Sequence, residues 1–68
     1  MPSTVIRAAH YDLDRQVLDI TFTTGRRYLY QDVPPDEADR FRAAFSKGRH
    51  FNAHIRDHYA FIEVAGET

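Results

Sequence analysis

The chain has 68 residues, with ten acidic and nine basic side chains, a formal net charge of −1 and no cysteine. This length predicts one domain with a modest core, and the charge argues against a protein built to coat nucleic acid. The absence of thiols excludes a disulfide framework and a thiolate metal site. No stretch resembles a signal peptide or approaches the roughly 20 apolar residues of a membrane span, so we expect a soluble, cytoplasmic protein.

Three strands are predicted in the first half of the chain. The β-branched, small and aromatic run from Thr4 to Tyr11 predicts the first strand, and "DLDRQ" predicts a turn after it. The segment "VLDITFT" alternates with the two-residue period of a half-buried strand, as does "RRYLYQ". A three-residue loop at "TTG", with Gly25 at positive φ, would join these two strands in a hairpin.

The loop length decides where the two central tyrosines lie. A three-residue loop places Leu18 opposite Tyr30. It also places Ile20 opposite Tyr28, so that both tyrosines share the apolar face with Phe22. A two-residue loop would turn them to the wetter face, because a one-residue slip reverses every side chain. We favour the longer loop because it pairs apolar with aromatic residues across the strands.

Two helices are predicted in the second half. The segment "DVPPDEADRFRAAF" begins a helix near Pro35, with acidic residues in its first turn. A second helix is expected from Arg49 to His58, with Ser46 as its cap, and Phe61 to Val64 permit a short final strand. The apolar stripes of the two helices are formed by Ala38, Phe41 and Phe45, and by Phe51, Ile55 and Tyr59.

This order of elements predicts an α+β fold. Two helices would pack on one face of a small antiparallel three-stranded meander, with an optional short C-terminal strand. We expect residues 1–68 to form a single domain with an ordered core over about 3–62 and a frayed C-terminal tail.

Several segments in the same order resemble one family. They are "VIRAAHYD", "YLY", "VPP" and "SKGRHFNAHIRDHY". From about Ser3 to Phe61 the chain is similar to the KTSC domain, a short module at the C-terminus of some lysyl-tRNA synthetases that is also found as a stand-alone bacterial protein. The resemblance places the family's signature on Tyr28, Tyr30, Ser46, Gly48, Asn52, Ile55 and Arg56. It implies an accessory domain for which RNA binding has been proposed, an association at the level of the fold.

A candidate nucleic-acid or anion site lies in a basic block over residues 40–58, in which Asp57 is the one acidic residue. Arginine forks and the start of the second helix suit phosphate groups. The candidate residues are Arg40, Arg42, Ser46, Lys47, Arg49 and Arg56. An alternative interpretation is a solvated helix surface whose cations pair with Asp36, Asp39 and Asp57. The sequence leaves both open.

Tyr28 and Tyr30 also have two interpretations. Aromatic side chains on sheet-based RNA readers stack on bases, but stacking requires that the helices leave this face open. Core packing is favoured here, because the two rings face Leu18 and Ile20 across the hairpin.

Metal binding and catalysis are not expected. His50, His54 and His58 recur every four residues, the spacing at which a pair can chelate a metal. No cysteine or nearby glutamate completes a tetrahedral set, so we predict no metal and no cofactor. Ser46, a histidine and Asp57 lie within one segment, and so short a chain leaves little room for a pocket that excludes water.

The leading hypothesis is a small accessory module that binds RNA, such as tRNA or a ribonucleoprotein surface, through a basic helical edge. The alternative is a protein-interaction or self-association module without a nucleic-acid role, including a homodimer. It would use apolar residues such as Val17 and Leu29 on the outer face of the sheet.

Overall fold

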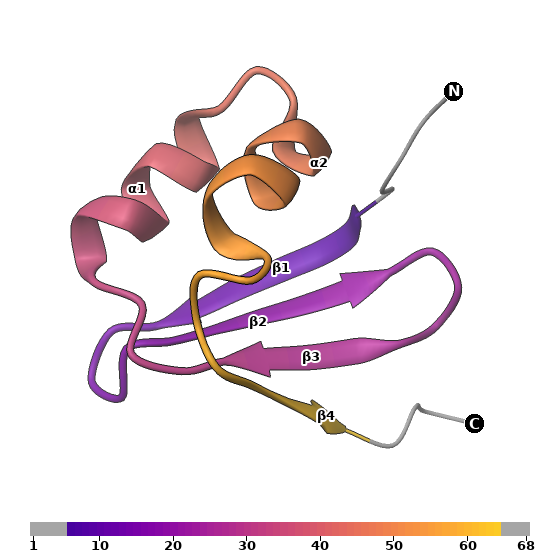
Figure 1. The fold of residues 1–68 in the computed structure, drawn as a ribbon, viewed down its shortest axis with the longest axis horizontal. Coiled ribbons are helices and arrows are strands. Elements are labelled where there is room, and N and C mark those ends of the chain that lie inside the picture. The colour runs from indigo at the N-terminus through magenta and orange to yellow at the C-terminus, as the bar shows by residue number, and fades with distance from the viewer. Residues whose placement is uncertain (1–5, 65–68) are drawn as a thin grey trace.

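A computed structural model describes residues 6–64, which form a four-stranded antiparallel sheet with helices on one face (Figure 1). The strands, in the spatial order β1-β2-β3-β4, are Ile6–Asp12, Val17–Phe22, Arg27–Tyr30 and Phe61–Val64. The helical elements are α1 (Pro35–Ala43), α2 (Lys47–His50) and the π-helical turn η1 (Phe51–Ile55). The predicted α+β fold is confirmed, and the optional final strand is present. The predicted start of the first strand at Thr4 and the C-terminal tail lie outside the described residues.

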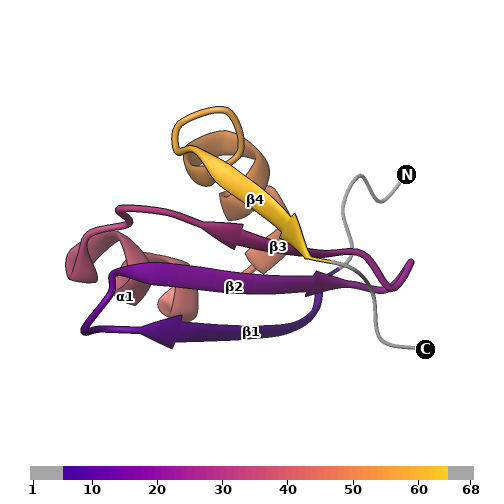
Figure 2. The same ribbon diagram turned by 90° about the horizontal axis from the view of Figure 1, so that it is seen from below.

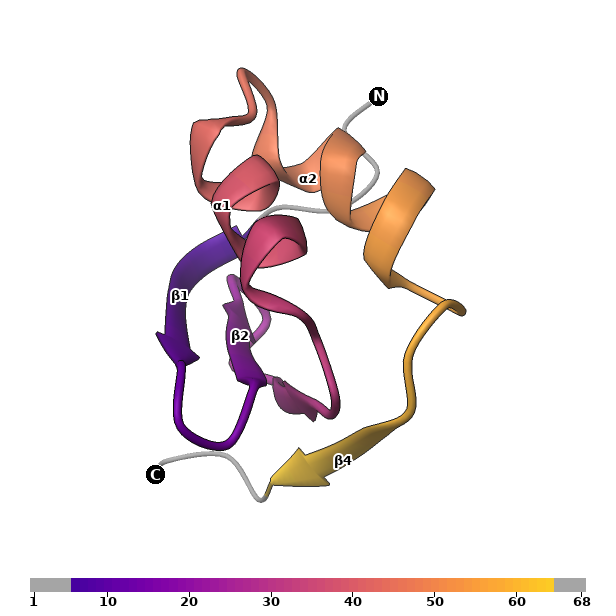
Figure 3. The same ribbon diagram turned by 90° about the vertical axis from the view of Figure 1, so that its left-hand side faces the viewer.

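The helices form a second layer over the sheet (Figure 3). α1 and α2 lie on the same side of the sheet, and the chain that leaves η1 runs down to β4 at the far edge. The predicted placement of two helices on one face is therefore confirmed. Among the elements of residues 6–64, no helix is long and apolar enough to cross a membrane.

The β2–β3 hairpin has the predicted register. Leu18 pairs with Tyr30, and Ile20 pairs with Tyr28. Gly25 closes the loop at φ 95° and donates its N–H to the carbonyl of Phe22 at 2.9 Å. Glycine suits this position because it adopts positive φ without a clash at Cβ. Both tyrosines therefore lie on the same face as Leu18 and Ile20.

β4 extends the sheet beyond β3. Leu29 lies opposite Ile62, and Tyr30 lies opposite Phe61. Seen from below, β4 is tilted against the other three strands (Figure 2). This pairing brings Phe61, a residue far along the chain, to the edge of the tyrosine-bearing strand.

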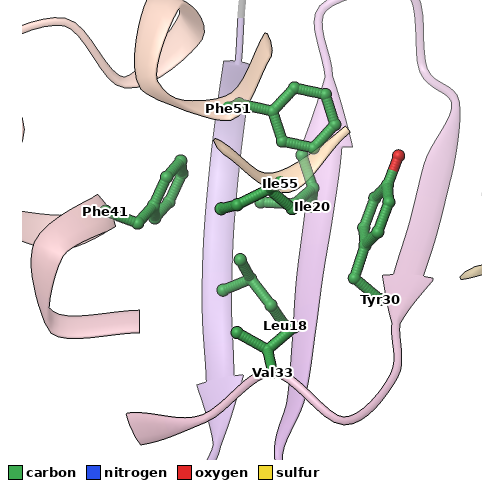
Figure 4. Packing of buried hydrophobic residues seen from close by; sticks show 7 residues of the cluster. All are labelled: Leu18, Ile20, Tyr30, Val33, Phe41, Phe51 and Ile55. Atoms are coloured by element: carbon green, nitrogen blue, oxygen red, sulfur yellow. The ribbon is translucent and has the colours of Figure 1, made fainter. Parts of the chain in front are cut away.

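The core lies between the sheet and the helical segment. Figure 4 shows Phe41 of α1 on one side and Tyr30 of β3 on the other, with Phe51 between them. The buried cluster consists of Leu18, Ile20, Tyr30, Val33, Phe41, Phe51 and Ile55. Tyr11 joins β1 to the segment before α1, because its hydroxyl donates to the carbonyl of Val33 at 2.6 Å.

The prediction that Phe45 belongs to the buried stripe is wrong. α1 ends at Ala43, and Phe45 is fully exposed. Ala44 is extended, with φ −65° and ψ 137°, and the chain is extended again at Ser46, whose hydroxyl accepts the N–H of Arg49 at 3.4 Å. Because the chain leaves the helical path before Phe45, this residue loses the helical spacing that would have placed it over Phe41.

The second helix is shorter and less regular than predicted. It begins at Lys47 rather than Arg49, and it ends in the π-helical turn η1 rather than continuing to His58. The N–H of Arg56 donates to the carbonyl of Phe51 at 2.8 Å, which closes this wide turn. Asp57 then takes φ 69° and turns the chain toward β4.

Two phenylalanines near the end of α1 provide a matched test of this packing. We expect Phe41→Ala to destabilise the domain by about 3–5 kcal/mol, because it empties a fully buried site. For a domain of this size the melting temperature would fall by at least about 10 °C. Phe45→Ala should leave the melting temperature unchanged, because Phe45 is exposed. Thermal melts followed by circular dichroism measure both, and equal melting temperatures for the two variants would contradict the described core.

Candidate functional site

A groove opens at the margin of the core, beside the β2–β3 hairpin, β4 and the turn after η1. Its volume is about 590 Å³, which is within the range of small-molecule sites in proteins. Five aromatic side chains line it: Phe22, Tyr28, Tyr30, Phe51 and Phe61. The chain therefore has a concave surface, although this groove is open to solvent and is not the water-excluding pocket considered for catalysis. The groove exists because β4 extends the sheet beyond the strands that face the helices.

The aromatic rings of the groove contact one another in a continuous set. Tyr28 lies 5.0 Å from Phe61 and 5.4 Å from Phe22, measured between ring centroids. Tyr30 lies 5.4 Å from Phe61 and 5.3 Å from Phe51. Most of these pairs are tilted or edge-to-face, the arrangements that aromatic quadrupoles favour. The rings therefore form one supported surface rather than separate contacts.

The two tyrosines differ in their burial. Tyr30 is 3% exposed and belongs to the core, whereas Tyr28 is half-buried and packs at its margin. The prediction that both pack on the helix-covered face with Leu18, Ile20 and Phe22 is confirmed. Both rings also line the groove, where the half-buried Tyr28 is the more accessible of the two.

Charged and polar groups accompany the rings. Arg26 forms an ion pair with Glu63 at 3.7 Å. A side-chain hydrogen bond with Tyr28 and the negative charge of Glu63 raise the pKa of Arg26. Arg56 and Asp57 also line the groove. Burial is the main cause that raises the pKa of Tyr30, and the nearby Tyr28 raises it further. The positive charge of Arg56 opposes this shift. The Tyr30 phenol is therefore protonated at neutral pH and can donate a hydrogen bond.

The predicted anion-binding residues on α1 are paired with acids. Arg40 lies 4.0 Å from Asp36 and 3.5 Å from Glu37, and Arg42 lies 2.7 Å from Asp39. The pairs of Arg40 with Asp36 and of Arg42 with Asp39 join exposed side chains spaced three or four residues apart on one helix, where ion pairs contribute little. For Arg40 and Arg42 the structure thus matches the alternative of a solvated helix surface.

The other predicted cations are arranged differently. Among the ion pairs within residues 6–64, none involves Lys47, Arg49 or Arg56, and all three side chains are exposed. Ser46 is occupied as the cap of α2. Of the six predicted residues, Arg56 lines the groove. The structure therefore divides the predicted set between the α1 surface, the start of α2 and the groove.

Sequence reasoning did not propose most of the groove's residues as site residues, among them Arg26, Phe51 and Phe61. Arg26 was not considered because it lies outside the basic block, and Phe51 was assigned to the core stripe alone. Phe61 was assigned to an optional strand, and its place beside Tyr30 depends on the β3–β4 register. The sequence suggested the strand but not its partner.

His50 contacts a carboxylate. Its Nε2 lies 2.7 Å from Oε2 of Glu37, and both side chains are largely buried. The prediction that no glutamate lies near the histidines is wrong. The packing of α1 against α2 brings Glu37 to His50, although the two residues are 13 positions apart in the chain. The His54 ring lies 4.6 Å from that of His50, whereas the π-helical turn interrupts the regular spacing before His58. In the described part of the chain, no group of three or more potential ligands could hold a metal ion.

The serine and the aspartate considered for a catalytic triad have different surroundings. Asp57 lines the groove, whereas the Ser46 hydroxyl accepts the backbone N–H of Arg49.

The raised pKa of Tyr30 predicts a loss of stability at high pH. The folded protein retains this proton above the ordinary value of 10.0, where the unfolded chain releases it. The free energy of unfolding should therefore fall as pH rises through and above about 10. Tyr30→Phe should reduce this fall without abolishing it, since burial also raises the pKa of Tyr11 and Tyr59. Urea unfolding at pH 8 and pH 11 measures the effect, and identical pH dependence in both proteins would contradict it.

Residues 2–59 match the model of the KTSC domain. The chain is 42% identical over 62 residues to a protein of Tsukamurella paurometabola, with 91% of this chain and 92% of that protein covered. It is 36% identical over 65 residues to an uncharacterized protein of Stutzerimonas stutzeri, with 94% and 92% covered. A lysine–tRNA ligase of Nostoc punctiforme is 36% identical over 62 residues, which cover 91% of this chain and 11% of the ligase.

A solved structure has the same fold. The crystal structure of a KTSC domain protein from Yersinia pestis is similar with a TM-score of 0.86 and 30% identity, covering 96% of this chain and 94% of that one. The agreement extends over both the sheet and the helical layer, because nearly all of each chain is matched. By the family model, by its relatives and by this structure, the chain belongs to the KTSC domain family.

Proposed function

We propose that this protein is a small accessory module that binds RNA without catalysis. One observation carries the proposal, and it concerns residues 47–56, which comprise α2, η1 and the residue after η1. This segment bears three exposed cations, Lys47, Arg49 and Arg56, that have no ion pair within residues 6–64, and it borders an aromatic groove. The segment itself supplies Phe51 and Arg56 to that groove.

The two features serve different parts of an RNA strand. Lysine and arginine side chains bind phosphates and set the position of the strand, without reading its sequence. Aromatic surfaces accept unstacked bases, which occur in loops, bulges and ends. Because the whole chain has a net charge of −1, we expect weak affinity that depends on this local excess of cations.

One relative supports an RNA partner. The Nostoc punctiforme protein with a related domain is by name a lysine–tRNA ligase. We therefore favour tRNA or a ribonucleoprotein surface as the class of partner. A location in the cytoplasm is consistent with that class and with a chain that has no cysteine.

Salt titration and charge reversal test this proposal. If three or four cations each neutralise one phosphate, the log–log slope of affinity against salt should be about −2 to −3, at roughly −0.7 per contact. The double variant Arg49→Glu, Arg56→Glu should lose most of the binding, because two of those contacts become repulsive. Fluorescence anisotropy with labelled tRNA and a random oligonucleotide at two salt concentrations measures both effects.

A control with the same change in net charge separates local contacts from the overall field. The double variant Arg7→Glu, Arg15→Glu alters two exposed arginines in β1 and the turn after it. It should retain most of the affinity. Equal losses in the two double variants, or no binding by the native protein at low salt and micromolar concentration, would overturn the proposal.

A protein-interaction role is the second candidate. Ile62 is 57% exposed and pairs with Leu29 on the sheet face away from the helices, where Val17 is also half-buried. These side chains could bind another protein or a second copy of the chain. Sedimentation equilibrium should then give a mass above that of the monomer, and Ile62→Glu should restore the monomer mass. This candidate takes the place of the first if no RNA binds.

A further inference from the structure

We propose that the groove holds one unpaired nucleotide of the bound RNA, with its base against Phe61 and Tyr28 and its phosphate against Arg56. This inference rests on the proposed function and names the part of the RNA that the groove recognises.

The base would stack on an aromatic ring that is both exposed and held in place. Phe61 is 53% exposed although it belongs to a paired strand. Its ring is supported by Tyr28 at 5.0 Å and by Tyr30 at 5.4 Å. Because these neighbours limit the motion of the ring, stacking a base on it loses little side-chain entropy. Every base offers a π face, so this contact tolerates different sequences.

The charges of the groove match a single phosphate. Arg26 already pairs with Glu63, whereas Arg56 has no ion pair within residues 6–64. Asp57 lies beside Arg56 on the groove wall. One arginine can hold one phosphodiester, but a nearby carboxylate disfavours a cluster of phosphates such as a triphosphate. The phenol of Tyr30, which remains protonated, adds a donor near Arg56.

The hairpin provides polar groups at the edge of the groove. Thr23 and Thr24 line it, and the backbone N–H of Arg26 lies 3.5 Å from the Thr24 hydroxyl. Hydroxyl groups can both donate and accept hydrogen bonds. They suit the edge of a base or a ribose 2′-hydroxyl, which are within reach when the nucleotide is unpaired. In a duplex the base remains inside the stack and cannot enter such a groove.

A fluorescent base in the RNA tests this placement. A single-stranded oligonucleotide with one 2-aminopurine should change its fluorescence on binding, because stacking alters the emission of this base. Phe61→Ala should abolish the change and weaken affinity by roughly five- to a hundredfold, the range expected for one stacked base. The same oligonucleotide paired with its complement should give no fluorescence change at the 2-aminopurine.

Phe45→Ala is the matched control, because it removes an exposed phenylalanine that does not line the groove. It should leave both affinity and fluorescence unchanged. Phe61→Leu keeps an apolar residue in β4 but no ring, and circular dichroism confirms that each variant is folded. The inference is overturned if the Phe61→Leu protein binds the RNA with native affinity and gives the same change in 2-aminopurine fluorescence as the native protein.

The outcomes separate this inference from the proposed function. If Phe61→Ala binds RNA normally while Arg49→Glu, Arg56→Glu does not, the RNA role stands and the groove inference falls. If the native protein binds no RNA, the proposed function falls, and a titration with adenosine 5′-monophosphate followed by NMR tests the groove separately. Chemical-shift changes at Tyr28 and Phe61 would show that the groove binds a nucleotide, and their absence overturns the inference as well. If Phe61→Ala instead changes the mass of the protein in sedimentation, the groove is a protein contact and the inference falls.

Discussion

The register of the β2–β3 hairpin determines the rest of the structure. Gly25 closes a loop that pairs Leu18 with Tyr30 and Ile20 with Tyr28. With one residue fewer, the same strands would turn every side chain to the other face. The core would then lose its central residues, and the groove would lose its tyrosines. One backbone conformation at a loop therefore supports both the packing and the candidate site.

The π-helical turn links the core to the groove. Its wide spacing places Phe51 and Ile55 in the core and leaves Arg56 at the groove. Asp57 follows at φ 69°, an uncommon conformation for a residue other than glycine. Irregular turns of this kind are frequent at functional sites. Here the turn also directs the chain to β4, which carries Phe61.

Ion pairs within the fold reduce the number of cations that are available to bind a ligand. The basic block over residues 40–58 contains five cations, but Arg40 and Arg42 are paired with acids on their own helix. The available positive charge is therefore smaller than the sequence suggests, and Arg56 brings part of it to the aromatic groove. A similar pairing joins His50 to Glu37 and gives this histidine a structural neighbour. Charge counted along a chain overestimates charge that is free to bind a ligand.

The sequence by itself determined the α+β fold, the hairpin register and the cap at Ser46. Each of these depends on short-range signals: two-residue alternation, a glycine that permits positive φ, and a hydroxyl before a helix. Tertiary structure alone decided that Phe45 is exposed, that Glu37 meets His50, and that Phe61 completes a groove with the tyrosines. Phe45 is exposed because the chain becomes extended at Ala44. The other two features join residues far apart in the chain, which helix packing and strand order, encoded by no local pattern, bring together.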